Sequence, residues 1–264
     1  MFWQAGSGTT TLSATNTLNG RILMTAGTLA VGEPANLGQA SVPLSFSGGV
    51  LRISNTGWNN LGDHGVNWST FNGGFDIAAA GESITLTNPV GNANAAGTLS
   101  KFGAGSLFVS NAAVVKQTVL LHQGTTVVAS AGSVTATTYA SVGQLTPTNS
   151  TLLMRGNGSF VSVGDFNIGD ISGSTGFLAV ADSAGVVARQ LYVGKSGSAA
   201  GVVSLTGGSI QSTAGSDWRI GGGTGTNDFA AYGYVRQTGG LFFNVNNCQI
   251  GAFGLGQYDQ LAGP

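Results

Sequence analysis

The stretch from Gly103 to Val128, GAGSLFVSNAAVVKQTVLLHQGTTVV, decides the fold because its pattern occurs twice in the chain. The first copy lies 97 residues earlier, from Gly6 to Val31, and aligns with the second copy without a gap. Each copy consists of a Gly-x-Gly turn, a strand-forming run, a polar turn, a second run, a Gly-Thr turn and a third run. Repeats of this kind favour stacked units, each of which buries its apolar face against its neighbour.

A shorter repeat fills the C-terminal half. Four predicted strands end in an aliphatic residue followed by glycine, namely Ile168-Gly169, Val193-Gly194, Ile220-Gly221 and Ile250-Gly251. The successive glycines are 25, 27 and 30 residues apart. A four-stranded propeller blade needs ~40–50 residues, whereas a coil of a parallel β-helix needs ~20–25. The spacing therefore predicts a β-helix of roughly ten to thirteen coils.

The strand-forming runs alternate apolar and small polar residues. Ile84 and Leu86, for example, alternate with Thr85 and Thr87. A period of two indicates a strand with one buried face, and no long stretch has the spacing of an amphipathic helix. We expect an all-β chain with one repeat block at 1–147 and a second at 148–264, within one continuous structural domain.

The composition agrees with stacked strands. Only 7% of the 264 residues are charged, against about 25% in ordinary domains, and 45 are glycine. Identical charges repeated in every coil would lie side by side and repel, while corners with positive φ need glycine. The net charge of −1 and the lack of a basic block exclude a nucleic-acid footprint. No apolar run approaches the ~18 residues of a transmembrane helix, so no membrane insertion is expected.

Residues 98–110, TLSKFGAGSLFVS, resemble the signature LTKTGAGTLTLSG of the autotransporter-associated β-strand repeat. Residues 11–32, 36–38 and 47–54 are similar to the continuation of that repeat, and together these stretches cover most of residues 6–130. It implies a right-handed parallel β-helix in a large exported bacterial protein, located outside the cell or on its surface. It supplies no catalytic residue, because the signature belongs to a scaffold.

The resemblance and the composition together predict a non-enzymatic structural segment, a stalk or fibre. The N-terminus lacks the features of a signal peptide, and we interpret the chain as a segment of a longer protein. Stacked coils leave open strand edges at their ends, which are templates for pairing with another chain. We therefore expect self-association through the solenoid ends.

An adhesin or glycan-binding module is the alternative function. The densest aromatic and polar patch contains Trp58, Trp68 and Phe71 among several asparagines. Exposed aromatic rings stack on sugar rings, so these three residues are the candidate glycan contacts. The opposing interpretation is that the rings fill the solenoid or cover a loop.

A β-helical polysaccharide lyase or hydrolase is the enzymatic alternative, and it would require clustered carboxylates beside a base. Asp165 and Asp170 bracket one strand end, and Arg189 lies in the next unit. Neither aspartate has an acidic counterpart in later units, which favours scattered solubilising charges. We interpret Asp63-His64 as part of a solvated loop and His122 as an outward strand residue, and we expect no catalytic residue.

No cofactor or metal is expected. Cys248 is the only cysteine, and we interpret it as a small buried thiol rather than a nucleophile or a ligand. The segment 222–230, GGTGTNDFA, approaches a calcium-binding nonapeptide. Calcium sites need oxygen ligands from successive turns, and the single imperfect copy favours a plain glycine-rich corner.

Overall fold

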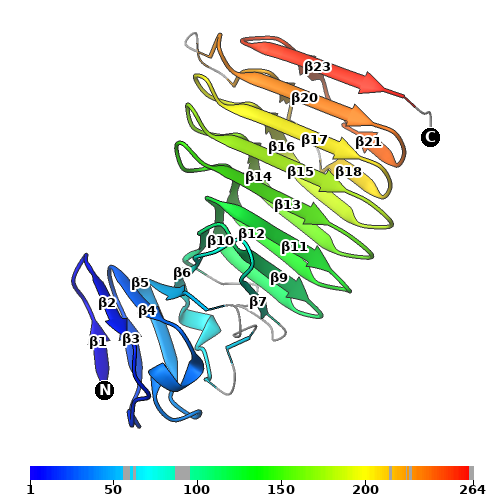
Figure 1. The fold of residues 1–264 in the computed structure, drawn as a ribbon. Coiled ribbons are helices and arrows are strands. Elements are labelled where there is room, and N and C mark those ends of the chain that lie inside the picture. Colours follow the sequence, from blue (N-terminus) through cyan, green and yellow to red (C-terminus); the bar gives the residue numbers. More distant parts are fainter. Residues whose placement is uncertain are drawn as a thin grey trace.

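The computed structural model describes residues 1–55, 60–61, 64–86, 96–213, 216–223, 225 and 228–261. In this part of the chain, short strands are stacked from the N-terminus to the C-terminus, and the two termini lie at opposite ends of the stack (Figure 1). Every strand pairing among these residues is parallel. The arrangement confirms the predicted all-β, parallel β-helical fold.

The strands form two long sheets. The ladder of the 15-stranded sheet runs through β1 (Phe2–Gln4), β3 (Ile22–Met24), β5 (Leu44–Ile53), β6 (Asn72–Ile77), β8 (Thr98–Phe102), β10 (Ala113–Leu121), β12 (Ser133–Val142), β14 (Ser159–Ile168), β16 (Gly185–Val193), β18 (Ser209–Ser212) and β21 (Leu241–Phe243). The same sheet includes β2 (Thr9–Leu12), β4 (Thr28–Val31), β19 (Trp218–Ile220) and β22 (Cys248–Ile250). The 8-stranded sheet contains β7 (Ser83–Leu86), β9 (Ser106–Ser110), β11 (Gly124–Ala129), β13 (Asn149–Met154), β15 (Thr175–Val180), β17 (Ala200–Leu205), β20 (Tyr232–Gln237) and β23 (Leu255–Gln260).

The larger sheet is continuous across the boundary that the sequence repeats place between residues 147 and 148. That boundary lies in the loop between β12 and β13, and β12 pairs directly with β14. Two short 3-10 helices, η1 (Pro34–Leu37) and η2 (Trp68–Thr70), interrupt the N-terminal coils. They have no counterpart among the sequence expectations, because single helical turns leave too short a pattern to detect.

The core is a column of aliphatic side chains contributed by alternate residues of each strand. In β15 every second residue is buried, and Leu178 is the register partner of Leu152 in the coil before and of Val203 in the coil after. All three side chains are fully buried. Because strand residues alternate between faces, the period-two pattern of the sequence becomes a continuous apolar interior.

The longest strands bend in the middle, so that a coil has three straight runs. The pairing of β14 with β16 shifts register between Ser162 and Asp165, and a shift of this kind bends a strand. The next corner is at Gly169, where φ is +71° and a Cβ atom would lie 2.1 Å from the Ala200 carbonyl oxygen. The glycines that close the four strand ends predicted from the sequence all have positive φ. The spacing of these glycines is therefore the distance along the chain between equivalent corners of successive coils.

The two copies of the 97-residue repeat have the same local structure. Strands β2 and β4 of the first copy correspond to β9 and β11 of the second. Gly27 and Gly124 are equivalent and have φ values of +61° and +73°. A Cβ atom on either residue would lie within 2.4 Å of a carbonyl oxygen, that of Gly6 in the first copy and that of Gly103 in the second. Glycine is therefore conformationally required at this position of the motif.

A buried side chain caps the glycine turn in each copy. In the first copy, Gln4 Nε2 donates to the carbonyl oxygens of Gly6 at 3.0 Å and Gly8 at 3.2 Å. Lys101 is the equivalent residue of the second copy, and its fully buried ammonium group donates to the Gly103 carbonyl at 2.6 Å. The same nitrogen lies 3.0 Å from the Phe102 carbonyl and 2.9 Å from the Gln123 carbonyl. A neutral amide and a cation thus bind the equivalent carbonyls of Gly6 and Gly103, while their other acceptors differ.

Candidate functional site

One outer face of the larger sheet is lined with polar side chains. Register pairing places the residues that point away from the core in one row, which consists of Ser141, Asn167, Tyr192, Arg219 and Gln249. The first three are buried beneath neighbouring segments, and Arg219 and Gln249 are half-buried. The ion pairs between described residues also lie on this face or at its corner, and they join Arg52 to Asp76 at 3.4 Å, Asp165 to Arg189 at 3.2 Å and Asp170 to Lys195 at 3.6 Å. In a chain with so few charges, this grouping makes the face the candidate functional surface.

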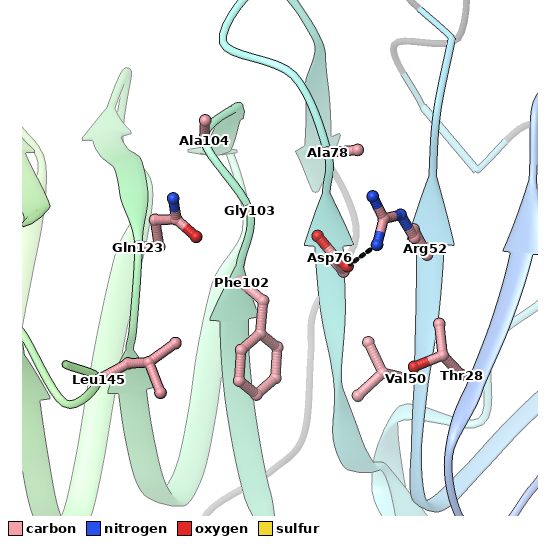
Figure 2. Close-up of a pocket in the computed structure, with 10 residues that line it drawn as sticks. All are labelled: Thr28, Val50, Arg52, Asp76, Ala78, Phe102, Gly103, Ala104, Gln123 and Leu145. Carbon is pink, nitrogen blue, oxygen red and sulfur yellow. Dashed lines mark ion pairs between the residues drawn. The ribbon is translucent and has the colours of Figure 1, made fainter. Parts of the chain in front are cut away.

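A groove of about 420 Å³ opens near the N-terminal end of this face. Figure 2 shows the described residues that line it, which are Thr28, Val50, Arg52, Asp76, Ala78, Phe102, Gly103, Ala104, Gln123 and Leu145. The Arg52–Asp76 ion pair lies on one side, and the ring of Phe102 lies between this pair and Gln123 (Figure 2). Asp76 is the single carboxylate among these lining residues.

Gly74 of β6 lies beside the ring of Phe102. Gly74 is the register partner of Val50 on one side and of Ser100 on the other. A Cβ atom on Gly74 would lie 2.8 Å from the Ser100 carbonyl oxygen and 3.1 Å from Cε2 of Phe102, so this position beside the ring has no room for a side chain. The ring of His122 supports Phe102 from the other side. The two rings stack with centroids 4.2 Å apart and planes inclined by 4°.

Burial and charge act against each other in the groove. Burial raises the pKa of Asp76, and the positive charges of Arg52 and Lys101 oppose that rise. Lys101 lies behind the lining residues, and burial lowers its pKa to about 8. Burial likewise lowers the pKa of His122, so its ring is neutral at physiological pH. The neutral ring stack of Phe102 and His122 therefore lies beside the Arg52–Asp76 ion pair, whose two charges cancel.

A second polar cluster surrounds Asp170, farther along the same face. The Tyr139 hydroxyl donates to one oxygen of Asp170, and Asn167 Nδ2 donates to the other at 3.2 Å. The ammonium group of Lys195 lies 3.6 Å from the Asp170 carboxylate and 5.1 Å from the centre of the Tyr192 ring. Burial, followed by the charge of Asp170, raises the pKa of Tyr139. Both oxygens of the carboxylate are therefore held by partners within the cluster, and Asp170 has a structural role.

The expectation for Asp170 was wrong, whereas Asp165 lies as expected. Asp170 is buried and holds a structural cluster, so it is not a solubilising surface charge. Asp165 and Arg189 form an ion pair between side chains that are partly exposed. Sequence spacing did not reveal the difference, because the partners of Asp170 come from three other strands or corners.

The predicted aromatic patch is largely packed into the core. Phe71 has no exposed surface, and its ring centre lies 4.7 Å from that of Phe46. Phe71 therefore cannot contact a glycan, which corrects the prediction for this residue. Trp68 is half-buried and packs on Phe71 with ring centres 5.2 Å apart. Trp58 lies outside the described residues.

A buried lysine fixes this aromatic segment. The Lys116 ammonium group donates to the backbone carbonyls of Phe71 at 2.7 Å and Trp68 at 3.0 Å. It also lies 5.3 Å from the centre of the Phe71 ring. Burial lowers the pKa of Lys116 to about 8. Sequence reasoning did not identify this residue, because a single lysine in a strand has the pattern of a solvated charge.

Both histidines differ from the sequence expectations. His64 is buried, and its ring nitrogens lie 3.0 Å from the Val42 carbonyl and 3.2 Å from the Pro34 carbonyl, so it is not in a solvated loop. His122 lies one residue beyond β10 and is buried by its stack on Phe102, so it is not an outward strand residue. Asp63 lies outside the described residues.

The expectations for Cys248 and for the glycine-rich corner can also be compared with the structure. Cys248 is exposed, because it belongs to the last coil, so the prediction of a buried thiol was wrong.

In the glycine-rich corner, the buried carboxylate of Asp228 accepts hydrogen bonds from the backbone N–H groups of Gly197 at 3.1 Å, Gly223 at 3.2 Å and Gly225 at 3.0 Å. These donors occupy the oxygens that a calcium ion would need. Residues 224, 226 and 227 lie outside the described part.

Among the described residues, no group of three or more His, Cys, Asp or Glu side chains is arranged to hold a metal ion. The same residues include no helix long and apolar enough to cross a membrane. Comparison with protein families, curated proteins and solved structures finds no match to this chain. The resemblance to autotransporter-associated repeats stays a prediction that rests on the residues quoted above.

Proposed function

We propose that the chain is a non-enzymatic structural segment, a stalk or fibre, of an exported bacterial surface protein, and that it self-associates end to end. The supporting observation is the uncovered cross-section of the last coil. Ile250 is 50% exposed, whereas Ile220, its register partner in the coil below, is 1% exposed. Phe242 and Tyr258 of the same coil pack on the core and are only partly buried. A further coil stacked on this end would bury this row.

The strand edges support the same association. β21 and β23 are the last strands of their ladders, and β1 is the first strand of the larger one. At the N-terminal end, Phe2 and Leu12 are likewise only partly buried against the core. The two ends carry different residues, so a contact between the N-terminal end of one copy and the C-terminal end of the next is heterologous. Contacts of that kind leave both outer ends open and generate filaments.

Ile250→Lys tests this proposal, because Ile250 is 50% exposed and the variant places a charge in the exposed cross-section. Val163→Lys is the matched control, since Val163 is 51% exposed at a bend far from either end. We expect the unmodified chain and Val163→Lys to form concentration-dependent oligomers or filaments in multi-angle light scattering and electron microscopy. We expect Ile250→Lys to reduce the oligomeric mass at least tenfold. A monomer at all concentrations, or an equal loss in both variants, would refute end-to-end association.

The two alternative functions have less support. A glycan-binding module centred on the aromatic patch would lack Phe71, because this residue is buried in the core. A polysaccharide lyase or hydrolase needs two free carboxylates facing one substrate. In the described part of the chain, Asp76 and Asp165 are each paired with an arginine, and Asp170 is bonded within its cluster.

A further inference from the structure

We propose that the groove between Arg52 and Gln123 binds a neutral sugar ring of a glycan chain, with Phe102 as the stacking platform. This site differs from the aromatic patch predicted from the sequence and does not depend on end-to-end association. The volume of about 420 Å³ lies within the ~300–1,000 Å³ typical of small-ligand pockets. Few convergent polar groups beside an apolar ring are the usual composition of such pockets.

The aromatic platform is rigid and has one open side. His122 covers one face of Phe102, and because His122 is buried, neither ring can turn without disturbing the corner. On the side toward β5, the Gly74 backbone lies close to Cε2 of the ring, and the part of Phe102 that lines the groove has Val50 across from it (Figure 2). Aromatic faces carry partial negative charge. The C–H groups on one face of a pyranose ring are apolar and weakly positive, so they complement this surface.

The polar groups of the groove fit hydroxyls rather than a charged ligand. The ionised Asp76 carboxylate accepts hydrogen bonds only, whereas the Arg52 guanidinium has five N–H donors, of which the ion pair occupies part. The side chain of Arg52 is 48% exposed and that of Asp76 is 18% exposed, so both have surface left for a ligand. Gln123 adds an amide that both donates and accepts. Sugar hydroxyls, which are donors and acceptors at once, match this set.

Anionic ligands fit the groove less well. The carboxylate of Asp76 is near the centre of the polar side and would repel a phosphate, a sulfate or a uronic acid (Figure 2). Arg52 already neutralises Asp76, and the ammonium group of Lys101 is turned to backbone carbonyls behind the lining. The charge that faces the groove is therefore close to zero, which favours a neutral hexose.

The experiment measures binding of soluble cellotetraose, maltotetraose, mannotetraose and chitotetraose, with tetragalacturonate as the acidic probe, by saturation-transfer NMR and calorimetry. We expect at least one neutral probe to bind the unmodified chain. Phe102→Ala should weaken that binding at least tenfold, and Asp76→Asn should weaken it severalfold. Phe108→Ala is the matched control, because Phe108 is also a half-buried, outward aromatic residue of a neighbouring strand.

The outcomes separate this proposal from the proposed assembly. Phe102→Ala should leave the oligomeric mass unchanged, and Ile250→Lys should leave sugar binding unchanged. Circular dichroism checks that each variant keeps its strand content. The proposal is overturned if no neutral probe binds, if Phe102→Ala binds as tightly as Phe108→Ala, or if only tetragalacturonate binds and does so more tightly to Asp76→Asn.

Discussion

Lys101 and Gln4 occupy equivalent positions in the two copies of the long repeat, and each caps the carbonyls of a Gly-x-Gly turn. Lys101 does so as a fully buried cation, whereas Gln4 does so without charge. Replacing Lys101 with glutamine therefore keeps donors for the turn and removes the charge. We expect Lys101→Gln to raise the free energy of unfolding at neutral pH.

The magnitude follows from the pKa of Lys101. Burial lowers this pKa from 10.5 to about 8 in the folded chain. Below pH 8 both folded and unfolded states carry the proton, and the folded state bears the full penalty of the buried charge. Between about pH 8 and 10.5 the folded state binds fewer protons, so stability rises with pH. At about 1.4 kcal/mol per factor of ten, the gain is at most about 3.5 kcal/mol.

The assay is urea unfolding of the unmodified chain and Lys101→Gln between pH 7 and 10, followed by circular dichroism. Lys116 is present in both proteins, so its own titration cancels in the difference. We expect Lys101→Gln to be more stable by about 2 to 3 kcal/mol at pH 7, and the difference to shrink steadily toward pH 10. A difference that stays constant with pH, or a variant less stable at pH 7, would refute the reasoning.

Two further variants test the corners and the buried cluster. Gly169→Ala should destabilise the chain by about 2 kcal/mol or more, because its φ is positive and the new methyl group would collide with the Ala200 carbonyl. Gly185→Ala is its control in urea unfolding and should change stability by about 1 kcal/mol at most, since only Ser209 Oγ at 3.8 Å is near that position; equal effects would contradict the corner argument. Asp170→Asn should lower the pKa of Tyr139 toward its ordinary value, because it removes a nearby negative charge and a hydrogen-bonded carboxylate. Ultraviolet titration of the phenol measures this pKa, and an unchanged titration would show that burial alone raises it.

The sequence predicts the coils of this protein better than it predicts their surfaces. A corner that requires positive φ leaves a glycine in every coil, so Gly169 and its equivalents are visible from spacing alone. The strand alternation likewise identifies which residues face the core. What a single chain does not show is which side chains meet across coils. Asp170 has the appearance of a surface charge until Tyr139, 31 residues earlier, and Lys195, 25 residues later, are placed beside it.

The same limit explains the errors for the other residues. His122 faces outward in the alternation but is covered by Phe102 of the preceding coil. Cys248 belongs to a core-facing row, and it is exposed only because it lies in the last coil. The polar sequence neighbours of Phe71 predict a surface ring, whereas its ring contacts Phe46 and Phe75 from adjacent strands. Burial in a solenoid is a property of neighbouring coils, and local composition does not contain it.

Lys101, whose buried charge lowers the stability of the fold, lies next to the groove. Gln4 shows that a neutral amide can cap the turn, so the fold alone does not require a buried cation at the equivalent position. Lys101 binds the backbone carbonyls of Phe102, Gly103 and Gln123, which are all lining residues of the groove. Residues that lower stability without a structural need concentrate at functional sites. The buried charge therefore lies directly behind the groove, and its three hydrogen bonds fix the backbone of lining residues beside the Arg52–Asp76 pair.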